Sequence, residues 1–351
     1  MSPTLLPKNR VVIASAGSRK STSLVEEALA LSNKKILVTT FTNENLDQLR
    51  RYFIERHGCV PKNVTLISWY SFLLQDCARP YQRALTSGPR INSIFFDALP
   101  TAVRRVKKTN TDQYYLTRKR DLYRDRVAEF VCAVDDQSAG LVMGRLERIY
   151  DHVFIDEVQD LAGYDLDILD KLLASKIATV CIGDPRQATF STNRGNKNKK
   201  YAGGRGFMIW LRETRRAALL EIEERVESFR CNQAICDFAD QLYPDLPKTV
   251  SANVQVTGHD GIFSIGKEAV AEYVKAHNPI VLRHNRRIET AGLRALNFGA
   301  SKGRTYDRVL IFPTKPMLEY LASNDLSKAG DVPKFYVAVT RARFSVTFVV
   351  S

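Results

Sequence analysis

The chain has 351 residues, of which 44% are hydrophobic and 26% charged, and its formal net charge is +14. The apolar fraction is that of a globular protein with two domains or one elaborated domain, and no apolar run is long enough to span a bilayer. The positive charge favours a polyanionic partner, most often nucleic acid, although solvated lysines and arginines alone are weak evidence.

The six cysteines lie far apart and form no C-x-x-C pair. This spacing argues against both a disulfide framework and a zinc site. The first ten residues lack the apolar core of a signal peptide. We therefore expect a protein of the reducing cytoplasm that does not associate with a membrane.

A stretch of small residues near the N-terminus predicts a phosphate-binding loop. Residues 14–22 follow the apolar run Val11–Ile13 and lead into a helical pattern. In such a loop, backbone N–H groups and the helix N-terminus bind phosphate, a lysine adds positive charge and a hydroxyl ligates Mg²⁺. The candidate nucleotide-binding residues are Ala16, Gly17, Ser18, Arg19, Lys20, Ser21 and Thr22.

The loop departs from the usual pattern, which has glycine at both ends of its four-residue gap. Ala14 holds the first of these positions and Arg19 the second. Glycine is favoured there because the backbone bends tightly and approaches a phosphate closely. Arg19 therefore either lends its side chain to the phosphates or blocks them. A strand–turn–helix corner with a basic tip is the alternative interpretation.

Short apolar runs rich in Val and Ile alternate with helical patterns along the first half of the chain. They predict strands at residues 10–14, 35–39, 64–68, 152–156 and 178–182. The alternation predicts an α/β fold with a parallel, doubly wound sheet, whose ligand sites lie at the carboxyl ends of the strands. Residues 85–145 break the alternation. We predict there a basic helical insertion that binds phosphates, with a solvated helix face as the alternative.

Two of the predicted strand ends carry aromatic residues. Phe41, Thr42 and Asn43 follow the second strand, and Trp69 and Tyr70 follow the third. Exposed aromatic rings at these positions would stack on the bases of a single strand, whereas rings folded into the core would serve packing alone. The residues by themselves leave both interpretations open.

The fourth predicted strand ends in two adjacent acids, Asp156 and Glu157. Because unpaired buried carboxylates are costly, such a pair at a strand end indicates a functional site. Asp156 can hold Mg²⁺ through water, and Glu157 can polarise the water that attacks a γ-phosphate. Gln187 follows the next strand, where it can sense the γ-phosphate, and Phe190 follows shortly after.

The α/β pattern restarts near residue 215. Strand-like runs lie at residues 262–265, 280–282, 309–312 and 346–350, and a helical pattern covers residues 336–343. These runs predict a second α/β unit close in size to the first. The predicted division is residues 1–84 and 146–214 for the first domain, 85–145 for the insertion and 215–351 for the second domain.

Taken in chain order, these stretches resemble the motif series of the UvrD/Rep family of superfamily 1 helicases. The matching stretches are residues 14–21 (the phosphate loop), 40–43 (T-F-T-N), 156–160 (D-E-x-Q-D), 183–187 (G-D-x-x-Q), 229–230 (for Tyr-Arg), 301–303 (K-G) and 337–342 (V-A-x-T-R-A). The resemblance implies two RecA-like parallel-sheet domains with a helical insertion in the first. It implies ATP and Mg²⁺ as cofactors, and single-stranded DNA or a single/double-strand junction as partner.

The resemblance also implies a role for each matching residue. These roles are phosphate binding for Lys20, Mg²⁺ binding for Ser21 and Asp156, activation of water for Glu157, nucleotide contact for Gln159, contact with the γ-phosphate for Gln187, Arg230 and Arg341, adenine stacking for Phe229, and contact with single-stranded DNA for Phe41, Thr42, Asn43, Trp69, Phe190, Ser301 and Lys302. Since the two arginines would come from the second domain, hydrolysis would depend on closure of a cleft.

Some residues depart from the family pattern. Ser15 and Arg19 replace loop glycines, Arg304 and Thr305 stand in place of Leu-Glu, and the spacing leaves no room for the large insertion of the second domain. The resemblance implies a minimal ATP-dependent DNA helicase or translocase with 3′-to-5′ polarity. By analogy with short relatives, it would be the motor of a repair or anti-phage nuclease system, with a nuclease as partner. The alternatives are a DNA-binding scaffold subunit whose ATPase is impaired by Arg19, and an RNA helicase.

Overall fold

The computed structural model describes residues 9–192, 195–213 and 218–350. The chain forms two compact units, each of which is treated separately below. Unit 1 comprises the chain up to Val12 with residues 21–185 and 190–223, and unit 2 comprises residues 13–20 and 186–189 with the chain from Glu224 onward.

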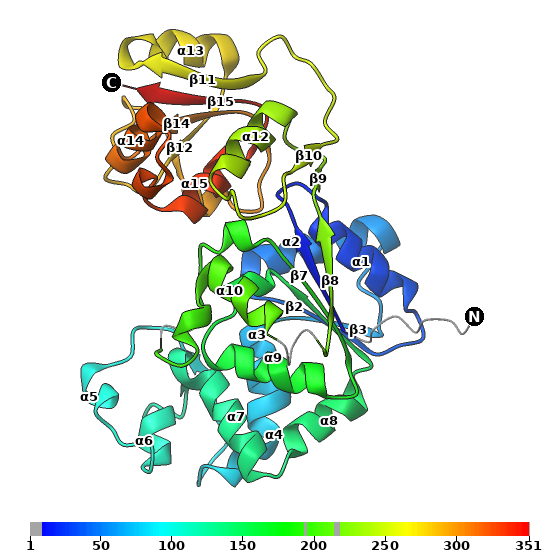
Figure 1. The fold of residues 1–351 in the computed structure, drawn as a ribbon. Helices are drawn as coiled ribbons and strands as arrows, with labels where there is room; N and C mark the ends of the chain where they lie inside the picture. Colours follow the sequence, from blue (N-terminus) through cyan, green and yellow to red (C-terminus); the bar gives the residue numbers. More distant parts are fainter. Residues whose placement is uncertain (1–8, 193–194, 214–217, 351) are drawn as a thin grey trace. The chain divides into compact units, whose positions relative to one another are not determined.

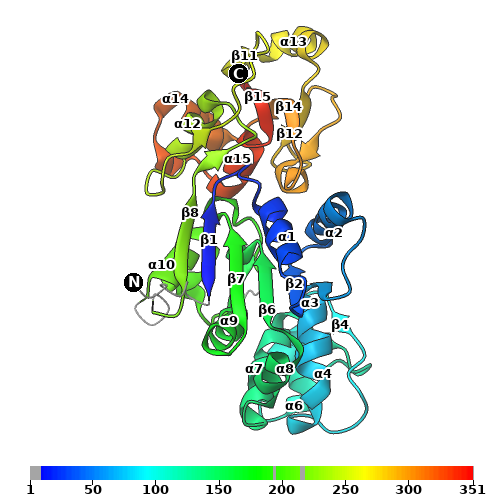
Figure 2. The ribbon, with the colours of Figure 1, turned by 90° about the vertical axis from the view of Figure 1, so that its right-hand side faces the viewer.

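Unit 1 is built on a six-stranded sheet with strand order β3-β2-β6-β7-β1-β8. Its strands are β1 (Arg10–Ala14), β2 (Ile36–Thr40), β3 (Val64–Ser68), β6 (His152–Asp156), β7 (Ala178–Gly183) and β8 (Glu221–Arg225). Figure 2 shows β6, β7, β1 and β8 side by side, and the β2–β3, β2–β6 and β6–β7 pairs are parallel. All five strands predicted for this part of the chain are confirmed. The edge strand β8 was not predicted, because four of its five residues are charged.

Helices connect the strands of this sheet, as the alternating sequence pattern predicted. They are α1 (Lys20–Ala30), α2 (Asn43–His57), α3 (Trp69–Phe72), α4 (Arg79–Tyr81), α9 (Tyr164–Ala174) and α10 (Gly203–Arg212). Thr42 begins α2 as its N-cap, since its side chain accepts a hydrogen bond from the Asn45 N–H. Gly58 ends the helix at φ 80°, a backbone conformation that glycine adopts without strain.

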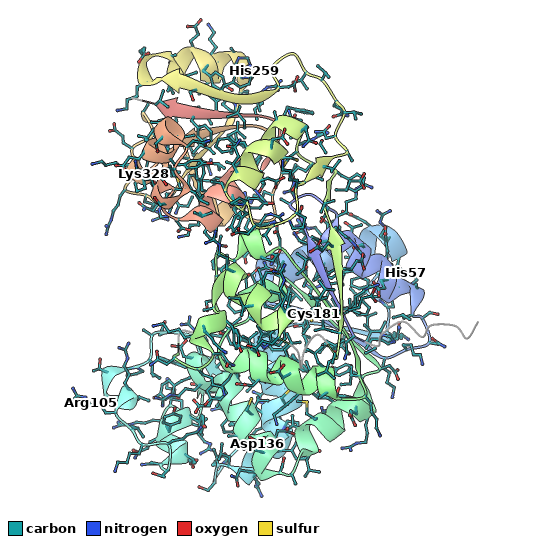
Figure 3. All side chains as sticks on the ribbon, viewed as in Figure 1. His57, Arg105, Asp136, Cys181, His259 and Lys328 are labelled. Atoms are coloured by element: carbon teal, nitrogen blue, oxygen red, sulfur yellow. The ribbon has the colours of Figure 1, made fainter. Side chains whose placement is uncertain are left out.

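The region predicted as a helical insertion, residues 85–145, is helical over less than half of its length and has two parts. Its elements are β4 (Ile94–Phe95), α5 (Thr101–Arg104), α6 (Thr111–Tyr115), β5 (Leu122–Tyr123), α7 (Val127–Gln137) and α8 (Leu141–Ile149). The strands β4 and β5 form a short parallel pair that was not predicted. Helix α7 packs against α9 and buries Phe130, so it belongs to the core of unit 1. Only α5 and α6 lie beyond α7 (Figure 1), and Arg105 marks their outer side in Figure 3.

Unit 2 is built on a five-stranded sheet with strand order β11-β15-β14-β12-β13. Its strands are β11 (Gly261–Gly266), β12 (Ile280–Arg283), β13 (Leu296–Asn297), β14 (Tyr306–Phe312) and β15 (Ala342–Val350), and every pair is parallel. The helices are α12 (Gln233–Gln241), α13 (Val270–His277), α14 (Lys315–Ser323) and α15 (Val332–Val339), while β9 (Glu227–Ser228) and β10 (Val250–Ser251) form a separate pair. The two α/β units that the sequence predicted are therefore confirmed.

The predicted helix over residues 336–343 is wrong at its C-terminal end. Helix α15 ends at Val339, and β15 begins at Ala342. Thr340 is the C-cap residue, and its hydroxyl donates to the Tyr336 carbonyl at 2.8 Å, which satisfies a carbonyl of the last turn. Arg343 consequently lies in a strand, where it pairs with Asp307 at 3.3 Å.

No helix within the described part of the chain combines the length and the apolar character that crossing a membrane requires.

Candidate nucleotide and nucleic-acid sites

Two of the predicted site residues, Ser21 and Asp156, lie in contact in unit 1. Ser21 lies in the first turn of α1, and its hydroxyl donates to the carboxylate of Asp156 at 2.8 Å, at the end of β6. Asp156 is only 3% exposed. Mg²⁺ in nucleotide sites takes one or two protein oxygen ligands and completes its shell with phosphate oxygens and water. A hydroxyl beside a carboxylate fits that requirement.

No group of three or more His, Cys, Asp and Glu residues that could hold a metal ion occurs in the described ranges. A metal enclosed by protein ligands alone is therefore not indicated there. The Ser21–Asp156 pair is compatible with an ion that arrives together with a nucleotide.

Glu157 follows directly and has an unusual backbone conformation. Its φ is 56°, in the left-handed region that non-glycine residues rarely occupy. Its N–H donates to the Asp156 carboxylate at 3.0 Å, and its carboxylate accepts a hydrogen bond from the Gln159 amide. Strained residues of this kind cluster at functional sites, because the surrounding contacts must hold them in place.

Gln159 connects the ends of two neighbouring strands. Its side chain is 1% exposed, and its carbonyl oxygen accepts from the Asp184 N–H at 3.1 Å, just after β7. A Cβ at Gly183 would lie 2.3 Å from that same oxygen, so the close approach requires glycine. The structure thus places Gln159 where it holds the side chain of Glu157.

The phosphate loop keeps the backbone conformation of a glycine-rich loop. Gly17 has φ 82° and Arg19 has φ 58°, so the arginine occupies a conformation that glycine adopts freely. Lys20 is 8% exposed. The hydroxyl of Ser18 is buried and has no hydrogen-bond partner among the described residues. An unsatisfied donor inside such a loop fits a site that binds an anion.

Within unit 2, the loop is bonded to the segment that contains Phe229. The Ser228 hydroxyl donates to the Ala16 carbonyl at 2.8 Å, and the Phe229 N–H donates to the Gly17 carbonyl at 3.0 Å. The guanidinium carbon of Arg19 lies 3.9 Å from the centre of the Phe229 ring. Arg19 therefore covers one face of the aromatic ring expected to stack on adenine.

Unit 2 also brings together Gln187, Arg341 and Lys302. Arg341 donates to the side-chain oxygen of Gln187 at 3.3 Å, and Lys302 donates to the Gln187 backbone carbonyl at 3.3 Å. Arg341 is 1% exposed, and its Nε also donates to the Val337 carbonyl at 3.0 Å. Arg230 donates to the Thr340 carbonyl at 3.1 Å. The polar groups of the second domain thus form one hydrogen-bonded cluster around the start of β15.

A cavity of about 570 Å³ in unit 1 is lined by two of the predicted nucleic-acid residues, Phe41 and Asn43. The ring of Phe41 lies 5.5 Å from that of Tyr70, which in turn meets Phe96 edge-on at 5.4 Å. Tyr70 and Phe96 were not among the predicted site residues. The pair Trp69-Tyr70 was a signal for one of them, but Phe96 lies in no motif.

Two of the residues predicted to contact nucleic acid are buried and not exposed. Trp69 is 1% exposed, and its indole N–H donates to the carboxylate of Asp165 at 2.6 Å, so its ring belongs to the core. Ser301 is fully buried and donates to the Phe298 carbonyl at 2.7 Å. Phe190, in contrast, is 42% exposed. Of the two adjacent aromatic residues after β3, Tyr70 and not Trp69 lines the cavity.

Residues 100–201 match a family model described as the UvrD/REP helicase N-terminal domain. No curated protein matches the chain. Among solved structures, arterivirus nonstructural protein 10, a helicase, is similar at 14% identity with a TM-score of 0.51, over 97% of this chain and 59% of that one. A complex of this arterivirus protein with DNA is similar at 13% identity with a TM-score of 0.50, over 98% and 61%.

The structure of the PRRSV helicase has 16% identity and a TM-score of 0.47, over 97% of this chain and 52% of that one. The chain thus spans between 52% and 61% of the length of these three proteins. At such identities the likeness concerns the fold alone. The family match and the fold both support the resemblance to UvrD-like superfamily 1 helicases, and residues 100–201 are similar to the UvrD/REP helicase N-terminal domain.

Proposed function

We propose that the chain is an ATP-dependent motor that moves along single-stranded DNA as a UvrD-type helicase or translocase. The observation that carries the proposal is the hydrogen bond of 2.8 Å between Ser21 and Asp156, with Glu157 as the next residue. It joins the helix that follows the phosphate loop to the acidic end of β6. Hydrolysis of a nucleoside triphosphate needs a metal-binding pair and an adjacent carboxylate in this arrangement.

In this proposal each group has one task. The loop N–H groups and Lys20 hold the phosphates, while Ser21 and Asp156 would hold Mg²⁺, which would supply neutralisation of phosphate charge. Glu157 orients the attacking water and accepts its proton, and Gln159 keeps the carboxylate of Glu157 in position. Arg341 stabilises the charge that develops on the transferred phosphoryl group.

Binding of nucleic acid is supported by the aromatic cavity and by the overall charge. The rings of Phe41 and of Phe96, which is 55% exposed, both contact the buried ring of Tyr70, and exposed aromatic rings stack on bases regardless of sequence. The formal net charge of +14 attracts a phosphate backbone. One similar solved structure is a helicase in complex with DNA. The 3′-to-5′ polarity and a role beside a nuclease in repair or anti-phage defence rest on the family resemblance alone.

The test is hydrolysis of ATP by the purified chain, with and without single-stranded DNA, single-stranded RNA and duplex DNA. We expect Mg²⁺-dependent hydrolysis that single-stranded DNA stimulates most. Equal or stronger stimulation by RNA would favour an RNA helicase. The absence of any hydrolysis stimulated by a single strand would overturn the proposal.

One observation favours a second candidate, a DNA-binding scaffold with an impaired ATPase. Arg19 stacks on Phe229, so this contact must break before a base can occupy the same face. A cation–π contact at an exposed site stabilises by about 0.5–1 kcal/mol, which lowers nucleotide affinity only a few-fold. Because the loop backbone also keeps a glycine-like path, we favour the active motor.

A further inference from the structure

A second and larger cavity of unit 1 contains none of the motif residues discussed above. Its volume is about 1000 Å³, and it lies between the core and the elements α5 and α6. It shares Phe96 and Arg124 with the aromatic cavity of about 570 Å³. The two cavities are therefore neighbours along one surface of the same unit. We call the larger one the insertion crevice.

The insertion crevice contains further aromatic rings. Phe96, at the boundary between the two cavities, is 55% exposed. Beyond it lie Tyr114, from α6, and Tyr164, the first residue of α9. Rings spaced along a groove are what successive bases of a single strand stack upon, because every base has a π-face.

Positive charge accompanies these rings. The ammonium groups of Lys197 and Lys108 lie 5.3 Å and 5.8 Å from the centre of the Tyr164 ring. The guanidinium of Arg126 lies 3.6 Å from the centre of the Tyr114 ring. Cations beside aromatic platforms serve both the phosphates and the bases of a single strand.

Three acidic residues line the crevice, Asp97, Asp125 and Glu129, and the last two have cationic partners. Glu129 is 8% exposed, accepts a hydrogen bond from Tyr114 at 3.1 Å and pairs with Lys108 at 2.6 Å. Asp125 pairs with Arg124 at 3.0 Å. Four cationic side chains line the crevice, namely Arg104, Arg124, Arg126 and Lys197, of which Arg124 pairs with Asp125 and the partly exposed Lys197 pairs with Asp167 at 3.6 Å. Burial raises the pKa of the Tyr114 and Tyr164 phenols, so both stay uncharged and do not repel phosphates.

We infer that the insertion crevice is a further subsite for the same single strand, with Tyr164 as its stacking platform and Lys197 as its phosphate contact. The inference rests on the proposed function and extends it. A strand would enter at Phe41, pass Phe96 and Arg124, and end against Tyr164. Short strands would then occupy only the aromatic cavity, whereas longer strands would occupy both cavities.

The test is fluorescence anisotropy with labelled oligothymidylates of about 4 to about 20 nucleotides, which covers the usual site sizes. For the wild type, affinity should rise with length in two stages. Tyr164→Ala and Lys197→Ala should remove the second stage, so that the longest strands bind about tenfold more weakly. The shortest strands should bind as they do to the wild type.

Three variants serve as controls. Tyr164→Phe keeps the ring and should retain the second stage. Tyr52→Ala and Lys62→Ala remove residues of the same types that line neither cavity, and they should behave as the wild type. Removing the bases from the distal half of a long strand should weaken the wild type and leave Tyr164→Ala unchanged, as expected for groups that act on each other.

Unchanged binding of all lengths by Tyr164→Ala would overturn the subsite, as would equal weakening at every length. Binding of free thymidine monophosphate that Tyr164→Ala abolishes, without any effect of strand length, would assign the crevice to a small nucleotide instead. A wild type that binds no single strand at any length would overturn the proposed function itself. These results are distinct from one another.

Discussion

The two units carry opposite chemistry at the ends of their strands. In unit 1, the residues at the end of β6 and the start of α1 present oxygen atoms, from Ser21, Asp156 and Glu157. In unit 2, the residues before β15 present cations, of which Arg341 is held by the Val337 carbonyl and the Gln187 side chain. Oxygen ligands suit a metal ion and a water molecule, whereas a fixed guanidinium suits a phosphate.

The largest effect should come from the acidic side of this comparison. Glu157→Gln keeps the size and the hydrogen bonding of the side chain but removes its ability to accept a proton. We expect ATP hydrolysis to fall about 10³-fold while nucleotide binding persists. Steady-state kinetics and binding of a fluorescent ATP analogue measure the two effects. Glu55→Gln, an exposed acid on α2, is the matched control. A loss smaller than tenfold would remove Glu157 from the proposed mechanism.

The cationic side should give the next largest effect. Arg341→Lys keeps the charge and loses the planar fork that bonds Gln187 and the Val337 carbonyl. We expect hydrolysis to fall about 10²-fold with little change in ATP affinity. Arg343→Lys, which changes a partly exposed residue of β15, should remain active. Equal losses in both variants would show that Arg341 acts through the stability of unit 2.

The third prediction concerns Asp165, a buried carboxyl group of unit 1 that should affect stability and not hydrolysis. Burial raises the pKa of Asp165 to about 6 from an ordinary value of 3.8, although hydrogen bonds from Thr192 and Trp69 oppose the shift. The Asp165 carboxyl group therefore keeps its proton to a higher pH in the folded state than in the unfolded state. The free energy of unfolding falls as pH rises from about 4 to about 6, by on the order of 3 kcal/mol.

Asp165→Asn cannot lose a proton and should remove this contribution. The stability difference between the variant and the wild type, measured by urea unfolding, should grow in favour of the variant between about pH 4 and pH 6 and then stay constant. Hydrolysis of ATP should be unaffected by the titration of this residue. A stability difference independent of pH would show that Asp165 is ionised throughout.

The smallest effect concerns Arg19, at the junction of loop and aromatic ring. Because its φ of 58° suits glycine, Arg19→Gly should preserve the loop while freeing the face of Phe229. We expect the affinity for ATP to rise about two- to fivefold, whereas inorganic triphosphate, which has no base, should not gain. Arg19→Lys keeps the charge as a control. A hundredfold rise in turnover would instead support the impaired scaffold, and a loss of binding would place Arg19 on the phosphates.

Much of the fold and of the nucleotide site was predictable because local pattern determines them. The apolar runs at β1, β2, β3, β6 and β7 are buried strands of a parallel sheet, where both faces are covered and the sequence is continuously apolar. The acids and hydroxyls of the candidate site follow these strands directly. In contrast, β8 is an edge strand of mainly charged residues, and no periodicity distinguishes it from a loop.

The proposed nucleic-acid surface was less predictable because it is assembled from distant segments. Trp69 and Tyr70 are adjacent and both are buried in α3, yet only Tyr70 borders the cavity, and their order in the sequence does not indicate which of them does. Tyr164 and Lys197 lie 33 residues apart in the sequence and match no motif, yet the Lys197 ammonium lies 5.3 Å from the centre of the Tyr164 ring. The roles of Phe190, Ser301 and Lys302 on a strand, like the domain limits at residues 85, 146 and 215, stay predictions.

The burial of most cysteines should allow selective labelling of a single thiol. Of its six thiols, only that of Cys59 is exposed, at the end of α2 in unit 1. Burial also raises the pKa of Cys77, Cys132 and Cys181, which keeps them in the unreactive thiol form. A maleimide dye should consequently attach at one position of the native protein. With Ala322→Cys, at an exposed position of α14, as a second attachment point, energy transfer between two dyes would measure the distance between these two positions with and without ATP.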